Sequence, residues 1–590
     1  MVDPRIYRAA FVPVVVAIVL AAFSLQGAPT GSSTSLAPDA FVGSRAFDEP
    51  STGLRPLAAT FPRRPPGSSA DRKVAARMAG VFRQTGLDVT THRFSARTAI
   101  GRTTLDTVVG VRAGASNRRV VVLAHRDALS SPATADLSGT ATLAELARIF
   151  QGRSLHKTLV LVSTSGGSGG DAGAEQFAGS RGGPVEAVLV LGDLAGRRIR
   201  GPEVIPWSQA RGIAPVSLRR TVASALTLET GRKVAELRLA GQFARLAFPL
   251  SVSEQGVLLA RGIPAVLVGV GGERGPGADR AVSQDRLQEM GRTVLRSVSA
   301  LDGREPALPA PGSALFYRRK LVPAWAVRLL VGALILPVAL AALDGFARVR
   351  RRREPVAMWL GWAVCAAIPF AAATIFAFVL ELTGLLPVVP SAPPPPGIHP
   401  FDPAAAAGLA SIGLVLGLAW LLLRRLVLST ARVKGDPASP GAAAAVLLLA
   451  VVLVLLVWIR NPFTAALLVL PLHATLLLVA PEVHLRRWLS LAALAISLVP
   501  AALVVVYYAG ALGLSLPEIP WFALQLTVGG HVGILGELAW CVAWGTLAGT
   551  VMIVAARSRR PAEAVPPRTR GPLSYAGPGS LGGTESALRR

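Results

Sequence analysis

The sequence predicts two joined parts: an α/β domain with a mostly parallel sheet and helices on both faces, followed by an all-α domain with several transmembrane spans. Between residues 61 and 302, short apolar runs alternate with amphipathic segments. After residue 320, apolar runs of about 20 residues recur, which is the length that crosses a bilayer. Hydrophobic residues make up 52% of the 590 residues, and the mean hydropathy of +0.50 is high for a soluble protein.

The first segment, residues 1–27, places Arg5 and Arg8 before an apolar run. This pattern predicts a signal anchor or first transmembrane helix, with a cleaved signal peptide as the alternative. Residues 28–60 are rich in Gly, Ser, Thr and Pro, and we expect a linker there.

Residues 61–302 are predicted to form the α/β domain, which at about 240 residues is large enough to bury its own core. Its apolar runs are typical of strands covered on both faces, and its amphipathic segments have helical spacing. The expected strands are 119–125, 158–164, 187–193 and 264–270, and the expected helices are 70–86, 138–150 and 283–301.

Residues 321–556 are predicted to form a transmembrane domain of about seven helices. The expected spans are 321–344, 356–381, 404–423, 441–459, 463–480, 488–512 and 534–556. The tail, residues 557–590, is rich in Pro, Gly and Arg and is expected to be disordered and cytoplasmic.

The net charge of +27 is explained by basic clusters at the ends of the apolar runs, such as 348–353 and 557–560. The positive-inside rule then places both termini in the cytoplasm and residues 28–317 outside the cell membrane. The basic triplet 318–320 is the exception to this pattern. The lipid bilayer is therefore the expected partner, and nucleic acid is not. Abundant Arg and Ala indicate a GC-rich bacterial genome, and the only cysteines, Cys365 and Cys541, lie in apolar runs.

Several sequence blocks in order make the α/β domain resemble the family-28 zinc aminopeptidases. These blocks are RRPPGSSADRKVAARMAGVFRQTGLDV (63–89), VVLAHRD (121–127), LSGTATLAELARIF (137–150), GAEQFA (173–178), LVLGDLAG (189–196) and SEQGVLLARGIPAVLVG (253–269). The overall plan is also similar to the attachment subunit of the eukaryotic GPI transamidase and to vacuolar membrane proteases. The resemblance implies a hydrolase fold whose members use two zinc ions and a glutamate base.

Carrying the family's residues over by position leaves only part of the site. The resemblance implies that His125 and Asp193 are ligands of one zinc, with Asp127 behind His125. The bridging aspartate falls on Ala135, one residue before Asp136, and the two glutamates fall on Gly167 (the general base) and Ser168. The final histidine falls on Gln255. Nearby, Asp171 could act as a base only if its loop rearranged.

The surviving residues allow three interpretations. His125, Asp136 and Asp193 could form a half-site for at most one zinc ion, or His125 and Asp127 could be a hydrogen-bonded pair without metal, with Asp193 capping a turn. The third interpretation is a working two-metal site. In the membrane part, His473 and Glu537 are functional candidates because ionisable groups are costly in a bilayer, although interhelical hydrogen bonding also accounts for them.

Three functions follow. The first is a catalytically degenerate family-28-like domain outside the cytoplasm that binds a peptide or a membrane protein. The second is an active zinc exopeptidase, an aminopeptidase, with a rearranged one-metal site. The third is a transport or lipid-handling membrane protein with an accessory outer domain.

Overall fold

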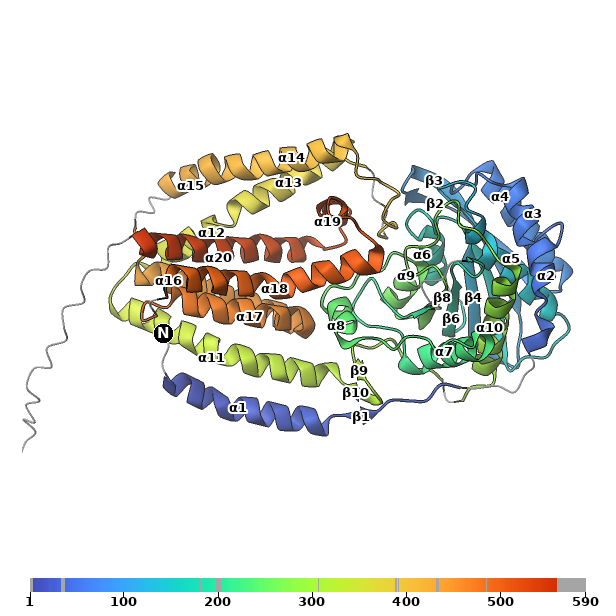
Figure 1. Cartoon of the computed structure of the whole chain (residues 1–590), viewed down its shortest axis with the longest axis horizontal. Coiled ribbons are helices and arrows are strands. Elements are labelled where there is room, and N and C mark those ends of the chain that lie inside the picture. The colour runs from blue at the N-terminus through green and yellow to red at the C-terminus, as the bar shows by residue number, and fades with distance from the viewer. Residues whose placement is uncertain are drawn as a thin grey trace, which may run out of the picture.

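The computed structural model describes residues 4–32, 38–180, 182–197, 203–305, 307–387, 390, 392–430, 435–483 and 485–559. An α/β domain and a bundle of long helices lie end to end (Figure 1). Of the tail predicted to be disordered, residues 557–559 instead end a helix that begins at Ile534, and residues 560–590 lie outside the described residues.

The α/β domain is built on a seven-stranded sheet in the order β2-β3-β5-β4-β6-β8-β7. The central strands β5, β4, β6 and β8 are parallel, whereas β2, β3 and β7 pair antiparallel at the two edges. Both β5 and β8 are buried along their whole length, as expected for parallel strands covered on both faces. The strands are β2 (Asp88–Thr98), β3 (Gly101–Arg112), β4 (Ser116–His125), β5 (Lys157–Thr164), β6 (Val185–Leu191), β7 (Glu203–Ile205) and β8 (Ala265–Gly269).

Helices cover both faces of this sheet. One layer of helices consists of α4, α5, α7 and α10, in which α5 contacts both α4 and α10 (Figure 1). A second pair, α6 and α9, pack against each other, with α6 contacting β3 and α9 contacting β8. Serine side chains cap the N-termini of α4 and α10 by accepting from the backbone N–H of Asp71 and Arg286. The helices are α4 (Ser69–Gln84), α5 (Ser138–Ile149), α6 (Ala172–Gly179), α7 (Val216–Thr230), α8 (Leu239–Ala247), α9 (Glu254–Ala260) and α10 (Gln284–Asp302). The predicted fold class is confirmed.

Residues 43–60 are not linker, contrary to our expectation for 28–60. They form α2 (Gly43–Asp48) and α3 (Leu54–Thr60). Phe41, Leu54 and Leu57 are buried in the main core, and α2 contacts α5 and α10. The prediction of a linker was wrong because most residues around these three buried apolar side chains are small or polar.

Seven helices are long and apolar enough to cross a membrane, and each falls on one predicted span. They are α11 (Ala324–Arg351), α12–α13 (Val356–Leu382), α14–α15 with the π-helical turn Ala419–Leu423 (Pro403–Thr430), α16 (Pro440–Arg460), α17 (Pro462–Val479), α18 (Arg487–Leu512) and α20 (Ile534–Arg559). A shorter helix, α19 (Glu518–Val528), was not predicted.

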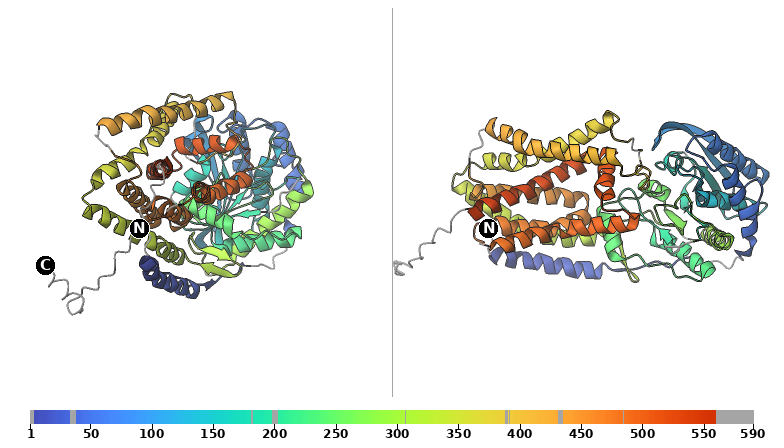
Figure 2. Two further views of the ribbon diagram at one scale, coloured as in Figure 1. Left: turned by 60° about the vertical axis from the view of Figure 1, so that its left-hand side comes forward. Right: turned by 45° about the horizontal axis from the view of Figure 1, so that its top comes forward.

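The N-terminal helix α1 (Pro4–Phe23) packs along α11 at the edge of the bundle (Figure 2). Just beyond it, β1 (Gln26–Gly27) pairs with β10 (Lys320–Val322), which pairs with β9 (Leu315–Tyr317). The chain therefore enters and leaves the α/β domain through neighbouring strands.

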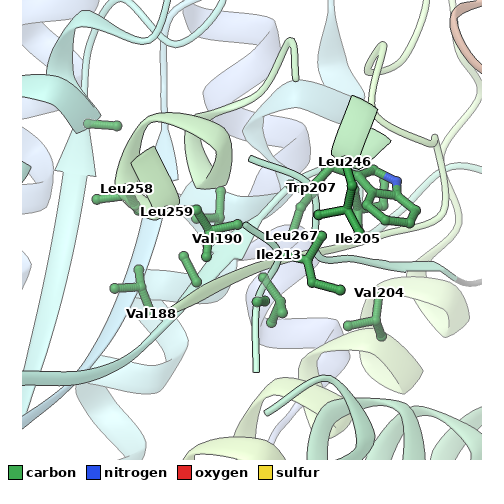
Figure 3. Close-up of a cluster of buried hydrophobic side chains, with 14 of the residues drawn as sticks. Val188, Val190, Val204, Ile205, Trp207, Ile213, Leu246, Leu258, Leu259 and Leu267 are labelled. Atoms are coloured by element: carbon green, nitrogen blue, oxygen red, sulfur yellow. The ribbon is translucent and has the colours of Figure 1, made fainter. Parts of the chain in front are cut away.

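The two parts are joined by α8, which sits on the first turn of α17. The side-chain amide of Asn461 donates to the carbonyls of Leu246 and Ala247, at 2.8 and 3.3 Å. Leu246 also belongs to the apolar core around Trp207 (Figure 3). The same core includes side chains of β6 and β8, so α8 connects the core of the α/β domain with the helical bundle.

Candidate functional site

The candidate site lies where the parallel strands end. His125 is the last residue of β4, Thr164 is the last of β5, and Asp193 follows β6 by two residues. Glu254, the first residue of α9, reaches the same place. The carboxyl ends of parallel strands are where α/β sheets place ligands.

His125 is bound by a carboxylate that the sequence analysis missed. Its Nδ1 lies 3.3 Å from Oε2 of Glu254, whose Oε1 accepts from the hydroxyl of Thr164 at 2.6 Å. Burial favours the neutral imidazole, but the hydrogen bond and charge of Glu254, with the charges of Asp127 and Asp136, outweigh it and raise the pKa of His125 to about 10. The contact with Glu254 therefore favours the protonated, imidazolium form of His125. The sequence could have indicated Glu254, because it directly precedes Gln255, the position to which the resemblance assigned a metal ligand.

Asp193 is neutralised by the protein itself. Its Oδ1 accepts from the backbone N–H groups of Ala195 and Gly196, at 3.0 and 2.7 Å. Its Oδ2 lies 2.7 Å from Nε of Arg280 in an ion pair whose carboxylate is fully buried. Burial raises the pKa of Asp193, and Arg280 opposes that rise. A guanidinium thus supplies the positive charge that a metal would bring.

Asp127 organises the glycine-rich loop that follows β5. Its Oδ1 accepts from the backbone N–H groups of Gly166 and Gly167, and its Oδ2 accepts from both the N–H and the hydroxyl of Ser168. The resemblance implied a role behind His125. The structure places the hydrogen bonds of Asp127 on the loop, while its charge still acts on His125.

Position 167, where the resemblance placed the general base, has no room for a side chain. A Cβ at Gly167 would lie 2.4 Å from Cβ and 2.6 Å from Cγ of His125. Such contacts are far inside van der Waals range, so a glutamate could return only if the loop or His125 moved. The packing around His125 therefore leaves no space at position 167 for the base that the resemblance implies.

Two other positions carried over from the resemblance, Gln255 and Ala135, are buried. Gln255 is buried, donating to Oγ of Ser251 at 2.9 Å and accepting from Oγ of Ser253 at 2.8 Å. Ala135 is buried in a short 3-10 turn that also carries Asp136. Burial raises the pKa of Asp136 to about 6, and the charges of His125 and Arg64 oppose the rise.

A further carboxylate, Asp171, lies at the same site in an unusual state. It occupies the N-cap position of α6 with a left-handed backbone (φ 56°) and no capping bond from its side chain. The residue is buried, and its Oδ2 lies 3.4 Å from the side-chain amide of Gln209. Burial first, then the negative charge of Glu254, raises the pKa of Asp171 well above its usual range. Left-handed non-glycine residues often mark functional or strained positions. Glu175, which follows on α6, instead pairs with Arg261 at 3.1 Å.

A proline-rich loop from the membrane domain covers the glycine-rich loop. A Cβ placed on Gly170 would lie 2.3 Å from Cγ of Pro390, which is itself buried. Arg274 fixes the same connection by donating to the carbonyls of Pro396 at 3.0 Å and of Gly513 at 2.9 Å. Pro390, in the connection between α13 and α14, therefore lies against the glycine-rich loop that follows β5.

The residues present do not fit a zinc ion in this arrangement. Zinc requires deprotonated ligands with available lone pairs, whereas Oδ2 of Asp193 is already paired with Arg280 at 2.7 Å. Within the described ranges, no group of three His, Cys, Asp or Glu side chains is disposed to hold a metal ion.

The two membrane candidates lie far from this site in the chain. Nδ1 of His473, on α17, is 2.9 Å from the carbonyl oxygen of Val469 one turn earlier. Glu537 lies in the first turn of α20, and so near the end of a span rather than at its centre. The local contact of His473 is the kind of hydrogen bonding that requires no function.

Comparison with known proteins gives solved structures only. No protein-family model and no curated protein matches the sequence. The chain is similar to the zinc aminopeptidase BSAP from Bacillus subtilis (13% identity, TM-score 0.36), covering 44% of this chain and 94% of that one. It is also similar to the glutaminyl cyclase of Porphyromonas gingivalis (18%, TM-score 0.36, 44% and 98%). A third similar structure is a leucine aminopeptidase precursor from Bacteroides thetaiotaomicron (16%, TM-score 0.36, 44% and 97%).

Proposed function

We propose that this chain is a multi-pass membrane protein whose α/β domain, related to family-28 peptidases, lies outside the cytoplasm and binds a peptide or a partner protein without hydrolysing it. The ion pair between Arg280 and Asp193 carries the proposal. The carboxylate of Asp193 is already neutralised by an arginine, so it does not need a catalytic cation to balance its charge.

Three further features support a binding role. Gly167 leaves no room for a base beside His125. Asp171 and Glu254 keep acidic groups near the strand ends, where a polypeptide could be contacted. The covering loop around Pro390 comes from the membrane domain, so an occupant of the site would touch both parts of the protein.

The orientation is part of the same proposal. Arg348, Arg350 and Arg351 lie in the last turn of α11, at the end of the span far from the α/β domain (Figure 1). The positive-inside rule assigns that end to the cytoplasm.

The test uses the full chain purified in detergent. Zinc is measured by elemental analysis, and hydrolysis is measured with a panel of aminoacyl substrates, for the wild type and for His125→Ala. We expect zinc well below one ion per chain and no turnover in either protein. Stoichiometric zinc and turnover that both disappear in His125→Ala would overturn the proposal and favour the exopeptidase.

Binding is tested separately with a pool of fluorescent peptides. Anisotropy with the wild type is compared with Gly170→Trp, which adds bulk between the glycine-rich loop and Pro390. The matched control is Gly101→Trp, where a Cβ meets no neighbour within 4 Å and the backbone is also left-handed (φ 101°). Binding reduced only by the first change supports a peptide site, and equal binding by all three proteins contradicts it.

A further inference from the structure

A cavity of about 240 Å³ lies at the boundary between the two parts of the protein, away from the strand ends. Arg211 comes from the α/β domain, Arg328 from the first turns of α11, and Arg460 from the last turn of α16. All three arginines are exposed. Residues far apart in the sequence thus bring three positive charges to one small cavity.

These charges have no acidic partner. No carboxylate lines the cavity, and within the described ranges none of the three arginines forms an ion pair. Arg211 donates to the carbonyl of Arg460, and Arg328 donates to the carbonyl of Ile459 at 3.2 Å. Carbonyl oxygens position a guanidinium without cancelling its charge. Three arginines gathered in this way repel each other unless an anion joins them.

Two helix N-termini add to the positive potential. Ala324, the first residue of α11, and Pro462, the first of α17, both line the cavity. The N-terminal end of a helix carries a partial positive charge and favours anions. The C-terminal end of α16 carries the opposite partial charge, but its carbonyls of Ile459 and Arg460 already accept from Arg328 and Arg211. The two N-termini and the three arginines together therefore favour an anion.

The cavity also lies at the level where a lipid headgroup would be. It is at the start of one predicted span and at the turn between two others, and Trp325 in its wall is 53% exposed, as is typical of interfacial aromatic residues. Its remaining wall includes apolar side chains such as Leu246 and Phe463. The basic triplet 318–320, which the positive-inside rule did not explain, lies in the hairpin just before α11.

We propose that this cavity binds the phosphate group of an anionic phospholipid in the leaflet next to the α/β domain. The arginines contact the phosphate oxygens, and the apolar wall accommodates the start of the acyl region. This inference does not depend on what the strand-end site binds.

The test is native mass spectrometry of the full chain in detergent, titrated with phosphatidylglycerol or with phosphatidylcholine. We expect tighter binding of phosphatidylglycerol and about fivefold weaker binding for each of Arg211→Gln, Arg328→Gln and Arg460→Gln, since one arginine near a membrane surface contributes about 1 kcal/mol. Arg83→Gln, on exposed α4, and Arg425→Gln, at the opposite end of the spans, are the controls. Thermal unfolding verifies that each variant is folded.

A parallel titration with inorganic phosphate separates the two sources of the same chemistry. Phosphatidylglycerol binding that persists in excess phosphate, and depends on the three arginines, supports the lipid site. Equal binding of the two lipids, equal weakening by the control variants, or complete displacement by free phosphate would each overturn it.

Discussion

Removing the arginine that neutralises Asp193 should destabilise the α/β domain strongly and in a pH-dependent way. Two unit charges about 4 Å apart attract by about 4 kcal/mol at an effective dielectric constant of about 20. Arg280 keeps 18% of its side chain exposed, and two backbone N–H groups still bind the carboxylate. We therefore expect Arg280→Met to cost about 2 to 3 kcal/mol, or about 5 to 10 °C in Tm for a domain of this size.

The charge origin of this loss is tested by a double-mutant cycle with Asp193→Asn. If the ion pair is the cause, the double variant should recover about 2 kcal/mol relative to the sum of the single changes. The sign of the pH effect also follows, because burial raises the pKa of Asp193 and loss of Arg280 raises it further. A carboxyl whose pKa is raised on folding destabilises the fold as pH rises through that pKa, so Arg280→Met should lose more stability at pH 8 than at pH 5.

The assay is thermal unfolding of the full chain in detergent at both pH values, with Arg83→Met on the exposed face of α4 as the control. A coupling energy below about 0.5 kcal/mol, the usual scatter for independent sites, would refute the reasoning. So would zinc that stabilises the wild type but not Asp193→Asn, because Asp193 would then be a ligand.

Three other changes test the site and the junction. Gly167→Glu should lower the free energy of unfolding by about 1 to 3 kcal/mol and create no peptidase activity, because its Cβ meets His125. Gly80→Glu, where a Cβ meets no neighbour within 4 Å, is the control for thermal unfolding. Measurable hydrolysis by Gly167→Glu would contradict this prediction. Glu254→Gln should lower the pKa of His125 from about 10 towards 6.5. In the wild type, the His125–Glu254 pair stabilises the fold fully below pH 6.5, and this contribution is lost as pH rises through about 10. NMR titration of His125 measures the pKa, and the Tm of Glu254→Gln should vary less with pH than that of the wild type. Asn461→Ala should lower the free energy of unfolding by about 1 to 2 kcal/mol, because it removes the N-cap of α17 and two hydrogen bonds to α8. An unchanged Tm would show that this contact between α8 and α17 does not stabilise the protein.

The central strands and the membrane spans were predictable because each corresponds to an unbroken run of apolar residues. The runs at 119–125 and 158–164 became β4 and β5 within a few residues. The hairpin β2–β3 was not predicted, because β2 is mostly exposed and its sequence, DVTTHRFSART, is polar. Composition likewise concealed α2 and α3, which depend on a few large side chains.

The candidate site was predictable in position but not in chemistry. His125 and Asp193 lie at strand ends, which the sequence pattern indicates directly. Their partners come from distant loops: Glu254 is 129 residues from His125, and Arg280 follows β8 in a segment with no regular pattern. Local sequence gives no information on such pairings, because the sheet order brings the loops together.

The pairing of β1 with β10 makes the α/β domain an insertion into a helical hairpin. Gly27 lies opposite Lys320, so the two ends of the inserted domain are side by side and α1 and α11 form the two arms of the hairpin. An inserted unit with adjacent ends can be gained, lost or exchanged without altering the path of the helices. A short turn in place of residues 28–319 would leave the hairpin intact, and the helical bundle could then be studied as a module in its own right.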